Sequence, residues 1–181
     1  MTETLAGRLL VATPSLLDPN FYRTVVLMIE HDEDGALGVV LNRPLEIPVA
    51  DYLEEWEYLV ADPPVVFSGG PVQPEVALAV ANGPHSTGDL SALIMEDIQL
   101  IDLDLDPAVV TFERIRVFSG YAAWAPRQLE GEINEGAWWV VDCLPDDPFV
   151  PDSGDLWSTV LRRQGGQLAL FATLPEDPGL N

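Results

Sequence analysis

The fold that we expect rests on residues 24–42, which read TVVLMIEHDEDGALGVVLN. Residues 24–31 are rich in valine, leucine, methionine and isoleucine, as is typical of a strand in the middle of a sheet. Asp32-Glu33-Asp34-Gly35 follows, and its glycine can take the positive φ that a short hairpin loop needs. Residues 36–42 read as the returning strand. The stretch therefore predicts a β-hairpin with Gly35 at a positive φ.

The rest of the chain is expected to add short strands and a few helices, from the spacing of its apolar residues and its Gly and Pro punctuation. The expected strands are residues 7–12, 65–67 paired with 75–80, 98–103, 116–118 ended by Gly120-Tyr121, 137–143 and 168–173. The expected helices are residues 51–60, 107–113, 128–133 and 156–163, the last closed by Gly165-Gly166. Residues 82–89, which include His85, are expected to form a loop.

Length and composition predict one domain over residues 1–181. A chain of 181 residues with 48% apolar side chains can bury one core and is short for two. A mean hydropathy of +0.14 and five tryptophans argue against disorder, because disordered chains lack the aromatic residues that offset the entropy lost on ordering.

The charge of the chain excludes several classes of function. All eight basic residues are arginines, so there is no lysine for a Schiff base, for pyridoxal phosphate or for a P-loop. The net charge of −22 opposes contact with phosphates and with anionic lipid surfaces. We therefore expect neither direct nucleic-acid binding nor membrane binding.

The cellular location is expected to be the cytoplasm. Residues 1–12 have no basic region ahead of an apolar core, as a signal peptide would, and no apolar run is long enough to span a bilayer. The lone Cys143 allows no disulfide within the chain, which fits a reducing compartment. We expect Cys143 to be a core residue.

Several blocks, in order along the chain, resemble the YqgE/AlgH family, and together they span nearly all of it. They are Ala12-Thr13-Pro14-Ser15-Leu16, Asp18-Pro19-Asn20-Phe21, Glu30-His31, Gly35-Ala36-Leu37-Gly38, Asn42-Arg43-Pro44, Ser68-Gly69-Gly70-Pro71-Val72, Ser119-Gly120-Tyr121-Ala122-Ala123-Trp124 and Gln128-Leu129-Glu130.

The resemblance implies an α+β fold in which a mainly antiparallel β-sheet curls into a pseudo-barrel with helices packed outside. It implies little about chemistry, since the family is largely uncharacterised and one member is named as a regulator of alginate gene expression. The chain departs from the family at Ala123 and Arg127, where glycine is usual. These departures bear on any activity that depends on the surface around Ala123 and Arg127.

His31 is the candidate for acid–base chemistry. Glu30 and Asp32 flank it, and neighbouring carboxylates raise the pKa of an imidazole towards the range useful for catalysis. The alternative is a histidine that caps the hairpin, because no nucleophile or orienting partner accompanies it. No catalytic residue is therefore assigned.

A ligand pocket, if present, is expected where two predicted strands end. Asn42 and Arg43 lie at one exit, Ser68, Gly69 and Gly70 lie at the other, and His31 is the remaining candidate ligand residue. Arg43 could hold a carboxylate or phosphate through its guanidinium, and the glycines could present backbone N–H groups. The alternatives are a salt bridge for Arg43 and a simple turn for the glycines.

Metals and cofactors are not predicted. Two distant histidines and one cysteine give no ligand cluster, and the Asp32-Glu33-Asp34-Gly35 segment lacks the glutamate that would close a calcium loop. The leading interpretation is a protein that binds a small anionic metabolite or a protein partner, with an indirect regulatory effect. The alternative is a small-molecule hydrolase or transferase that uses His31, Arg43 and the glycine segment.

Overall fold

The predicted hairpin is present in the structure, a computed structural model that describes residues 3–84 and 91–176. Strands β2 (Val25–Asp32) and β3 (Gly35–Val40) pair antiparallel, with Asp32 opposite Gly35. Gly35 has a φ of +138°, as predicted. A β-carbon at this position would also overlap the carbonyl oxygen of Trp124, so both backbone angle and space require glycine here.

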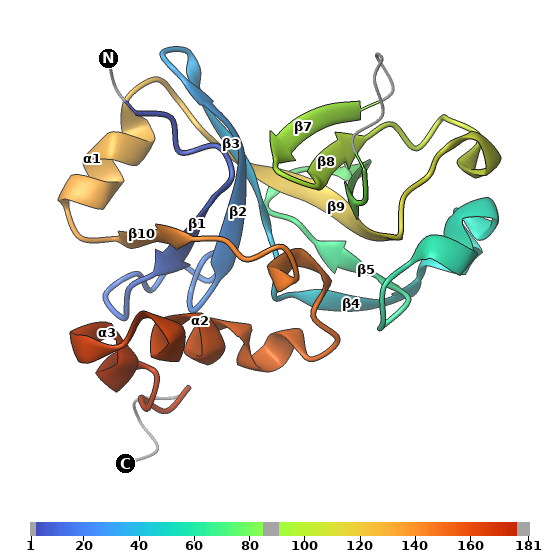
Figure 1. Cartoon of the computed structure of the whole chain (residues 1–181). Coiled ribbons are helices and arrows are strands. Elements are labelled where there is room, and N and C mark those ends of the chain that lie inside the picture. The colour runs from blue at the N-terminus through green and yellow to red at the C-terminus, as the bar shows by residue number, and fades with distance from the viewer. Residues whose placement is uncertain (1–2, 85–90, 177–181) are drawn as a thin grey trace.

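The hairpin lies inside a larger sheet (Figure 1). Among the described residues the strands follow the order β10-β1-β2-β3-β9-β6-β8-β7, while β5 pairs with β4 and with β9. The remaining strands are β1 (Arg8–Ala12), β4 (Pro44–Pro48), β5 (Val65–Ser68), β6 (Val72–Asn82), β7 (Ser91–Met95), β8 (Ile98–Ile101), β9 (Arg114–Trp124) and β10 (Trp138–Asp142). All the strand pairs are antiparallel except β5 with β9.

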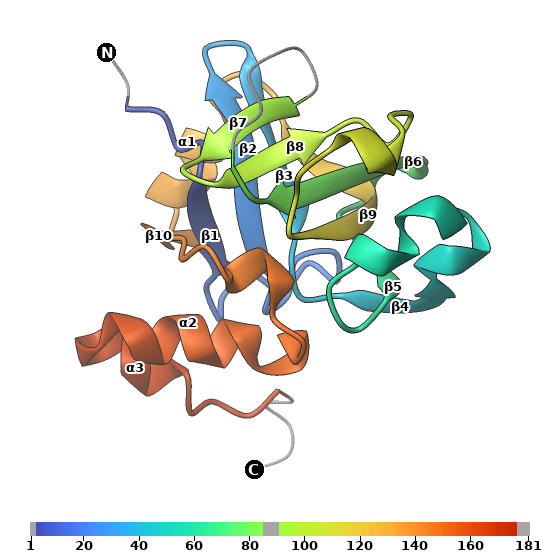
Figure 2. The ribbon, with the colours of Figure 1, turned by 45° about the vertical axis from the view of Figure 1, so that its right-hand side comes forward.

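The sheet curls into a half-barrel, and short helices lie outside it (Figure 2). The α-helices are α1 (Gln128–Asn134), α2 (Leu156–Gln164) and α3 (Gly166–Phe171). The 3-10 segments are η1 (Val49–Asp51), η2 (Glu54–Leu59), η3 (Pro107–Val109), η4 (Asp147–Phe149) and η5 (Ser153–Asp155). The α+β pseudo-barrel that the family resemblance implied is confirmed.

Both faces of the first strands are buried. In β1, Leu9 and Val11 pack with α2 in one core, whereas Leu10 and Ala12 pack with α1 in a second core on the opposite face. Alternate residues of a strand point to opposite faces, so a continuous apolar run suits a strand that is covered on both sides. Cys143 is buried in the first core, as predicted.

A third core supports the part of the molecule that contains η1 and η2. Trp56 is fully buried against β6 and β9, and its indole N–H donates to the carbonyl oxygen of Leu103 over 3.2 Å. The prediction of one amphipathic helix over residues 51–60 was wrong. Asp51 ends η1 and residues 54–59 form η2, and between them Leu53 has a φ of −135° and a ψ of 55°, which are not helical.

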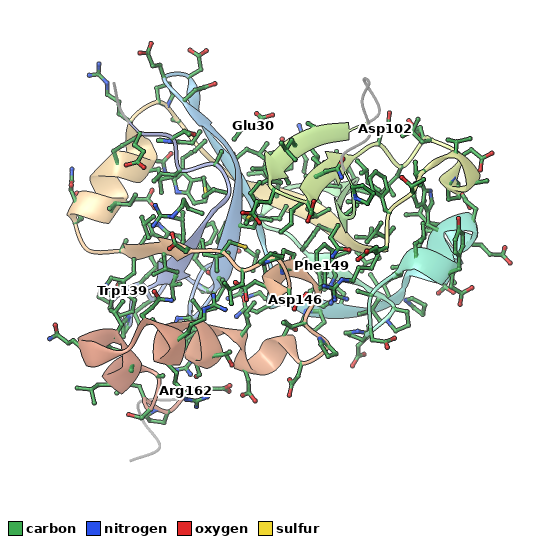
Figure 3. All side chains as sticks on the ribbon, in the orientation of Figure 1. Glu30, Asp102, Trp139, Asp146, Phe149 and Arg162 are labelled. Carbon is green, nitrogen blue, oxygen red and sulfur yellow. The ribbon has the colours of Figure 1, made fainter. Side chains whose placement is uncertain are left out.

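Two further predictions about strands were wrong. Residues 168–171 are helical and residues 172–173 form a turn, because α3 folds back along α2 and the Phe171 ring packs 5.1 Å from that of Trp139, labelled in Figure 3. Gly120 does not end its strand, since β9 continues to Trp124 with Gly120 at a φ of +72°.

Other predictions gave the correct type of secondary structure but the wrong pairing partner or the wrong length. Residues 75–80 belong to β6, which pairs with β8 and β9 rather than with β5. Residues 107–113 provide only the short turn η3. The segment that contains His85 lies outside the described residues. No helix in the part of the chain described here is long and apolar enough to cross a membrane.

Candidate functional site

His31 and Glu130 form a hydrogen-bonded pair between the end of β2 and the first turn of α1. The Nε2 atom of His31 lies 2.6 Å from a carboxylate oxygen of Glu130. The His31 side chain is only 5% exposed, whereas that of Glu130 is 35% exposed. The hydrogen bond from His31 is the main cause that lowers the pKa of Glu130 from its ordinary value.

Both ring nitrogens of His31 are occupied. The backbone N–H of Leu5 donates to Nδ1 over 3.0 Å, so in the neutral ring the proton is on Nε2, which donates to Glu130. A general base must offer a free lone pair to the proton that it removes. In His31 that lone pair already accepts from Leu5. The arrangement therefore suits a histidine that fastens the N-terminal segment and α1 to β2.

An open hollow of about 1160 Å³ lies beside the pair. The hairpin loop and the start of α1 form its walls, which include Asp32, Glu33, Asp34 and the cation Arg127. The three carboxylates favour cations over anions. Within residues 3–84 and 91–176, however, no group of three or more histidine, cysteine or acidic side chains has an arrangement that could hold a metal ion.

The side chain of Asn42, a predicted ligand residue, forms hydrogen bonds with the main chain of residues 23–25. Its side-chain oxygen accepts the N–H of Val25 over 3.1 Å, and its amide nitrogen donates to the carbonyl oxygen of Arg23 over 2.9 Å. These two bonds replace strand pairing where β3 has ended and the chain enters β2. Asn42 therefore fixes the position of residues 23–25.

Arg43 has a related role in the same loop. Its guanidinium donates to the carbonyl oxygen of Pro19 over 2.7 Å and to that of Tyr22 over 3.0 Å. Burial lowers the pKa of Arg43, and the nearby Asp18 carboxylate opposes that shift. The salt bridge weighed as an alternative from the sequence is absent from the ion pairs of the described residues. Arg43 caps main-chain carbonyls.

The glycine segment is packed against β9. The N–H of Gly69 donates to the carbonyl oxygen of Ser119 over 2.9 Å, and the Gly69 carbonyl accepts the N–H of Val40 over 2.9 Å. A β-carbon on Gly69 would overlap the carbonyl oxygen of Gly120, and one on Gly70 would overlap the Tyr121–Ala122 peptide group. Glycine is needed here because β3, β5 and β9 meet at this point.

The structure brings together some of the predicted residues and separates others. The N–H of Ser68 donates to the carbonyl oxygen of Arg43 over 2.8 Å, so the Asn42-Arg43 and Ser68-Gly69-Gly70 segments are neighbours. His31 lies at the opposite end of β2 from Val25, to which Asn42 is bonded. His31 and Arg43 therefore do not form one site.

Sequence reasoning missed the partner of His31 and the buried cation Arg116. Glu130 lies 99 positions from His31, and only the fold joins them. Arg116 is 1% exposed within β9, and its guanidinium stacks 4.3 Å from the centre of the Phe67 ring. It donates to the carbonyl oxygens of Ala61, Asp62, Pro63, Pro148 and Val150. Burial lowers the pKa of Arg116 to about 10.

A different surface combines exposed apolar side chains with uniform charge. Between Arg43 and Arg114 the sequence has no lysine or arginine, and apart from His85 its charged residues are all acidic. Tyr52, Tyr58 and Val109 project from this region, with 77%, 69% and 62% of their surfaces exposed. We call residues 51–58 and 102–109 the acidic face. Its exposed carboxylates are those of Asp51, Glu54, Glu55, Glu57, Asp102, Asp104 and Asp106.

The two segments of the acidic face are held together by aromatic side chains. The Trp56 indole bonds to the Leu103 carbonyl, and the Tyr58 hydroxyl donates to the Pro107 carbonyl over 3.1 Å. Figure 3 shows Asp102 on the opposite side of the molecule from Arg162 of α2. The acidic face is thus a fixed surface, remote from the arginines of α2.

Comparisons with known proteins agree on one family. The sequence profile described as AlgH-like matches residues 9–169. A UPF0301 protein of Streptomyces coelicolor is 50% identical over 190 residues, which cover 100% of this chain and 98% of that protein. The crystal structure of a Corynebacterium diphtheriae protein is similar with a TM-score of 0.89 and 33% identity, covering 96% of this chain and 94% of the other. The solution structure of AlgH from Pseudomonas aeruginosa gives a TM-score of 0.71 and 28% identity, covering 97% and 98%.

Proposed function

We propose that this chain, which belongs to the AlgH-like family, acts in the cytoplasm by binding a basic partner protein through its acidic face. The observation that carries the proposal is the exposure of Tyr52, Tyr58 and Val109 among carboxylates, in a stretch of sequence without a single arginine or lysine. Any regulatory effect of the protein would then be exerted through that partner.

The chemistry of the acidic face suits a protein rather than a nucleic acid. Tyrosine supplies a large contact area at a low cost in side-chain entropy, and aromatic residues are enriched at protein interfaces. Tyr58 is already held by the Pro107 carbonyl, so little ordering is needed when it binds. The carboxylates would steer a basic partner towards the face, and they would repel phosphates.

Site-specific photo-crosslinking in living cells tests this proposal. A benzophenone amino acid placed at Tyr52 or at Val109 should give one discrete protein adduct. The matched control is the same amino acid at Leu170, which is 70% exposed on α3, outside the acidic face. Changing Glu54, Glu55 and Glu57 together to lysine should abolish the adduct, because the charge that attracts the partner is reversed.

Two outcomes would overturn the proposal. One is an equal pattern of adducts from Val109 and Leu170, which would indicate random collision. The other is an adduct that survives the triple lysine substitution while the variant remains folded by circular dichroism. Purified adducts identified by mass spectrometry should contain a protein with an excess of arginine and lysine on its contact surface.

A further inference from the structure

The last described residues of the chain are held by side chains that donate to their main chain. The Arg23 guanidinium donates through one nitrogen to the carbonyl oxygens of Leu174 and Pro175, over 3.2 and 3.4 Å. The Tyr22 hydroxyl donates to the next carbonyl, that of Glu176, over 2.6 Å. We call residues 173–176 the strap. All three acceptors are main-chain oxygens, so these bonds do not depend on the identity of the exposed strap side chains.

The donors of these bonds sit on a rigid base. The Arg23 guanidinium lies 4.1 Å from the centre of the Trp157 ring, a cation–π stack. Trp157 is 2% exposed, and its indole N–H donates to the carbonyl oxygen of Ala12 over 2.9 Å. Arg23 also has a φ of +55°, a conformation that non-glycine residues adopt at a cost.

Asn42 and Arg43 hold that costly backbone in place. Asn42 binds the carbonyl oxygen of Arg23, and Arg43 binds that of Tyr22. The two residues that sequence analysis selected as ligand contacts are therefore positioning residues for Tyr22 and Arg23. A donor pair fixed before binding loses less entropy when an acceptor arrives.

We propose that Tyr22, Arg23 and Trp157 form a binding site for an extended peptide segment, and that the strap is its occupant within the same chain. Successive main-chain carbonyls of the peptide would take the places of those at 174–176. Within the described residues Arg23 forms no ion pair, so a carboxylate on the peptide could bind the rest of its guanidinium. This proposal is independent of the acidic face and of its partner.

The strap would act as a tethered competitor. A segment joined to its own site has a high effective concentration, so it lowers the apparent affinity of the site for any free peptide. The bonds that Tyr22 and Arg23 donate to the strap all go to main-chain oxygens, and these are groups that every peptide carries. A free peptide can therefore displace the strap once the strap is weakened.

The test uses the full chain and a fluorescein-labelled peptide that copies residues 172–176, with its C-terminus amidated. In one variant Leu174, Pro175 and Glu176 are all replaced by glycine, which raises the entropy lost when the strap binds. By fluorescence anisotropy this glycine-strap variant should bind the peptide at least about tenfold more tightly than the unchanged chain.

Substitutions in the glycine-strap background assign the site. Arg23→Ala should weaken peptide binding about tenfold or more, as expected for the loss of bonds from a charged donor. Tyr22→Phe should weaken it by a smaller factor. Arg162→Ala is the matched control, because Arg162 is an exposed arginine of α2 with no bond to the strap, and binding should be unchanged.

Three results would overturn the proposal: equal peptide binding by the unchanged chain and the glycine-strap variant, no binding by either at millimolar peptide, or equal losses from Arg23→Ala and Arg162→Ala. If Arg23→Ala fails to fold, Tyr22→Phe still decides the matter, since it removes only a hydroxyl group. Undiminished peptide binding by Tyr22→Phe in that case also contradicts the site.

Discussion

The Nε2 atom of His31 lies 2.6 Å from the carboxylate of Glu130, and this bond joins the end of a central strand to a helix 99 positions away. On its other side the imidazole accepts the backbone N–H of Leu5. One small side chain therefore connects the N-terminal segment, β2 and α1. The same two bonds occupy the atoms that a catalytic histidine would need.

The first prediction concerns the acid stability of this pair. Because the pKa of Glu130 is lowered in the folded state, its contribution to stability is present above the ordinary value of 4.5 and is lost as the pH falls through the lowered value. Glu130→Gln should flatten the fall of the urea midpoint below pH 4.5 relative to the unchanged chain. Glu135→Gln, at the end of the same helix, serves as the control. Parallel curves for Glu130→Gln and the unchanged chain would contradict the prediction.

The second prediction separates the two bonds of His31 from its bulk. His31→Ala leaves the Leu5 N–H and the Glu130 carboxylate without their partner, and should lower the free energy of unfolding by about 1–3 kcal/mol. His31→Gln retains one acceptor and one donor, and should cost less than about half as much. Chemical denaturation at pH 7 measures both. Equal losses would mean that the hydrogen bonds contribute little.

The third prediction concerns Arg116. Its guanidinium is buried and forms no ion pair with any described residue, and five carbonyl oxygens from residues 61–63 and 148–150 solvate it. Arg116→Met would leave those oxygens unsatisfied. We expect the free energy of unfolding to fall by about 3–5 kcal/mol, as when one side of a buried charged network is removed. The control is Arg114→Met, which breaks the pair with Asp146 and the stack of Arg114 on Phe149, and should cost only about 1–2 kcal/mol. Thermal unfolding distinguishes the two variants.

The sequence was sufficient for the central hairpin but not for the pairing of distant segments or for the type of every short segment. The β2–β3 hairpin followed from an apolar run and one glycine, both within 19 consecutive residues of sequence (24–42). The predicted partner of β5 was wrong because the next apolar run in the sequence is not its neighbour in the sheet. A segment of β9, 51 positions further along the chain, pairs with β5 instead, with Phe67 opposite Phe118. A short apolar segment such as 168–173 fits strand and helix equally, and packing on α2 decided in favour of a helix.

The candidate residues show the same limit. Asn42, Arg43 and the Ser68-Gly69-Gly70 segment were correctly expected to lie near one another, since strand ends meet at one edge of a sheet. The hydrogen-bond partners of their polar atoms could not be predicted, because every residue has a main-chain carbonyl and the sequence does not indicate which one is bound. Arg43 was therefore expected to bind a ligand or to form a salt bridge, whereas it binds the loop that carries Arg23.

The fourth prediction compares two glycines that both have a positive φ. Gly35→Ala should lower the free energy of unfolding by about 3 kcal/mol, because it combines backbone strain with an overlap against the Trp124 carbonyl. Gly136 has a φ of +83° and nothing near its missing β-carbon, so Gly136→Ala should cost only about 1–2 kcal/mol. Urea denaturation of the pair isolates the effect of the overlap. A larger loss at Gly136 would be inconsistent with this structure.

The last prediction concerns Arg127, a position at which the family resemblance led us to expect glycine. Arg127 has a φ of +65° and a ψ of 0° immediately before α1, a left-handed conformation that strains any residue with a β-carbon. Within the described residues its side chain forms no hydrogen bond or ion pair that would offset the strain. Arg127→Gly should therefore raise the free energy of unfolding by about 0.5–1 kcal/mol. Arg127→Ala is the control, since it removes the charge and keeps the β-carbon. If the alanine variant gains as much as the glycine variant, the gain comes from charge and the backbone argument fails.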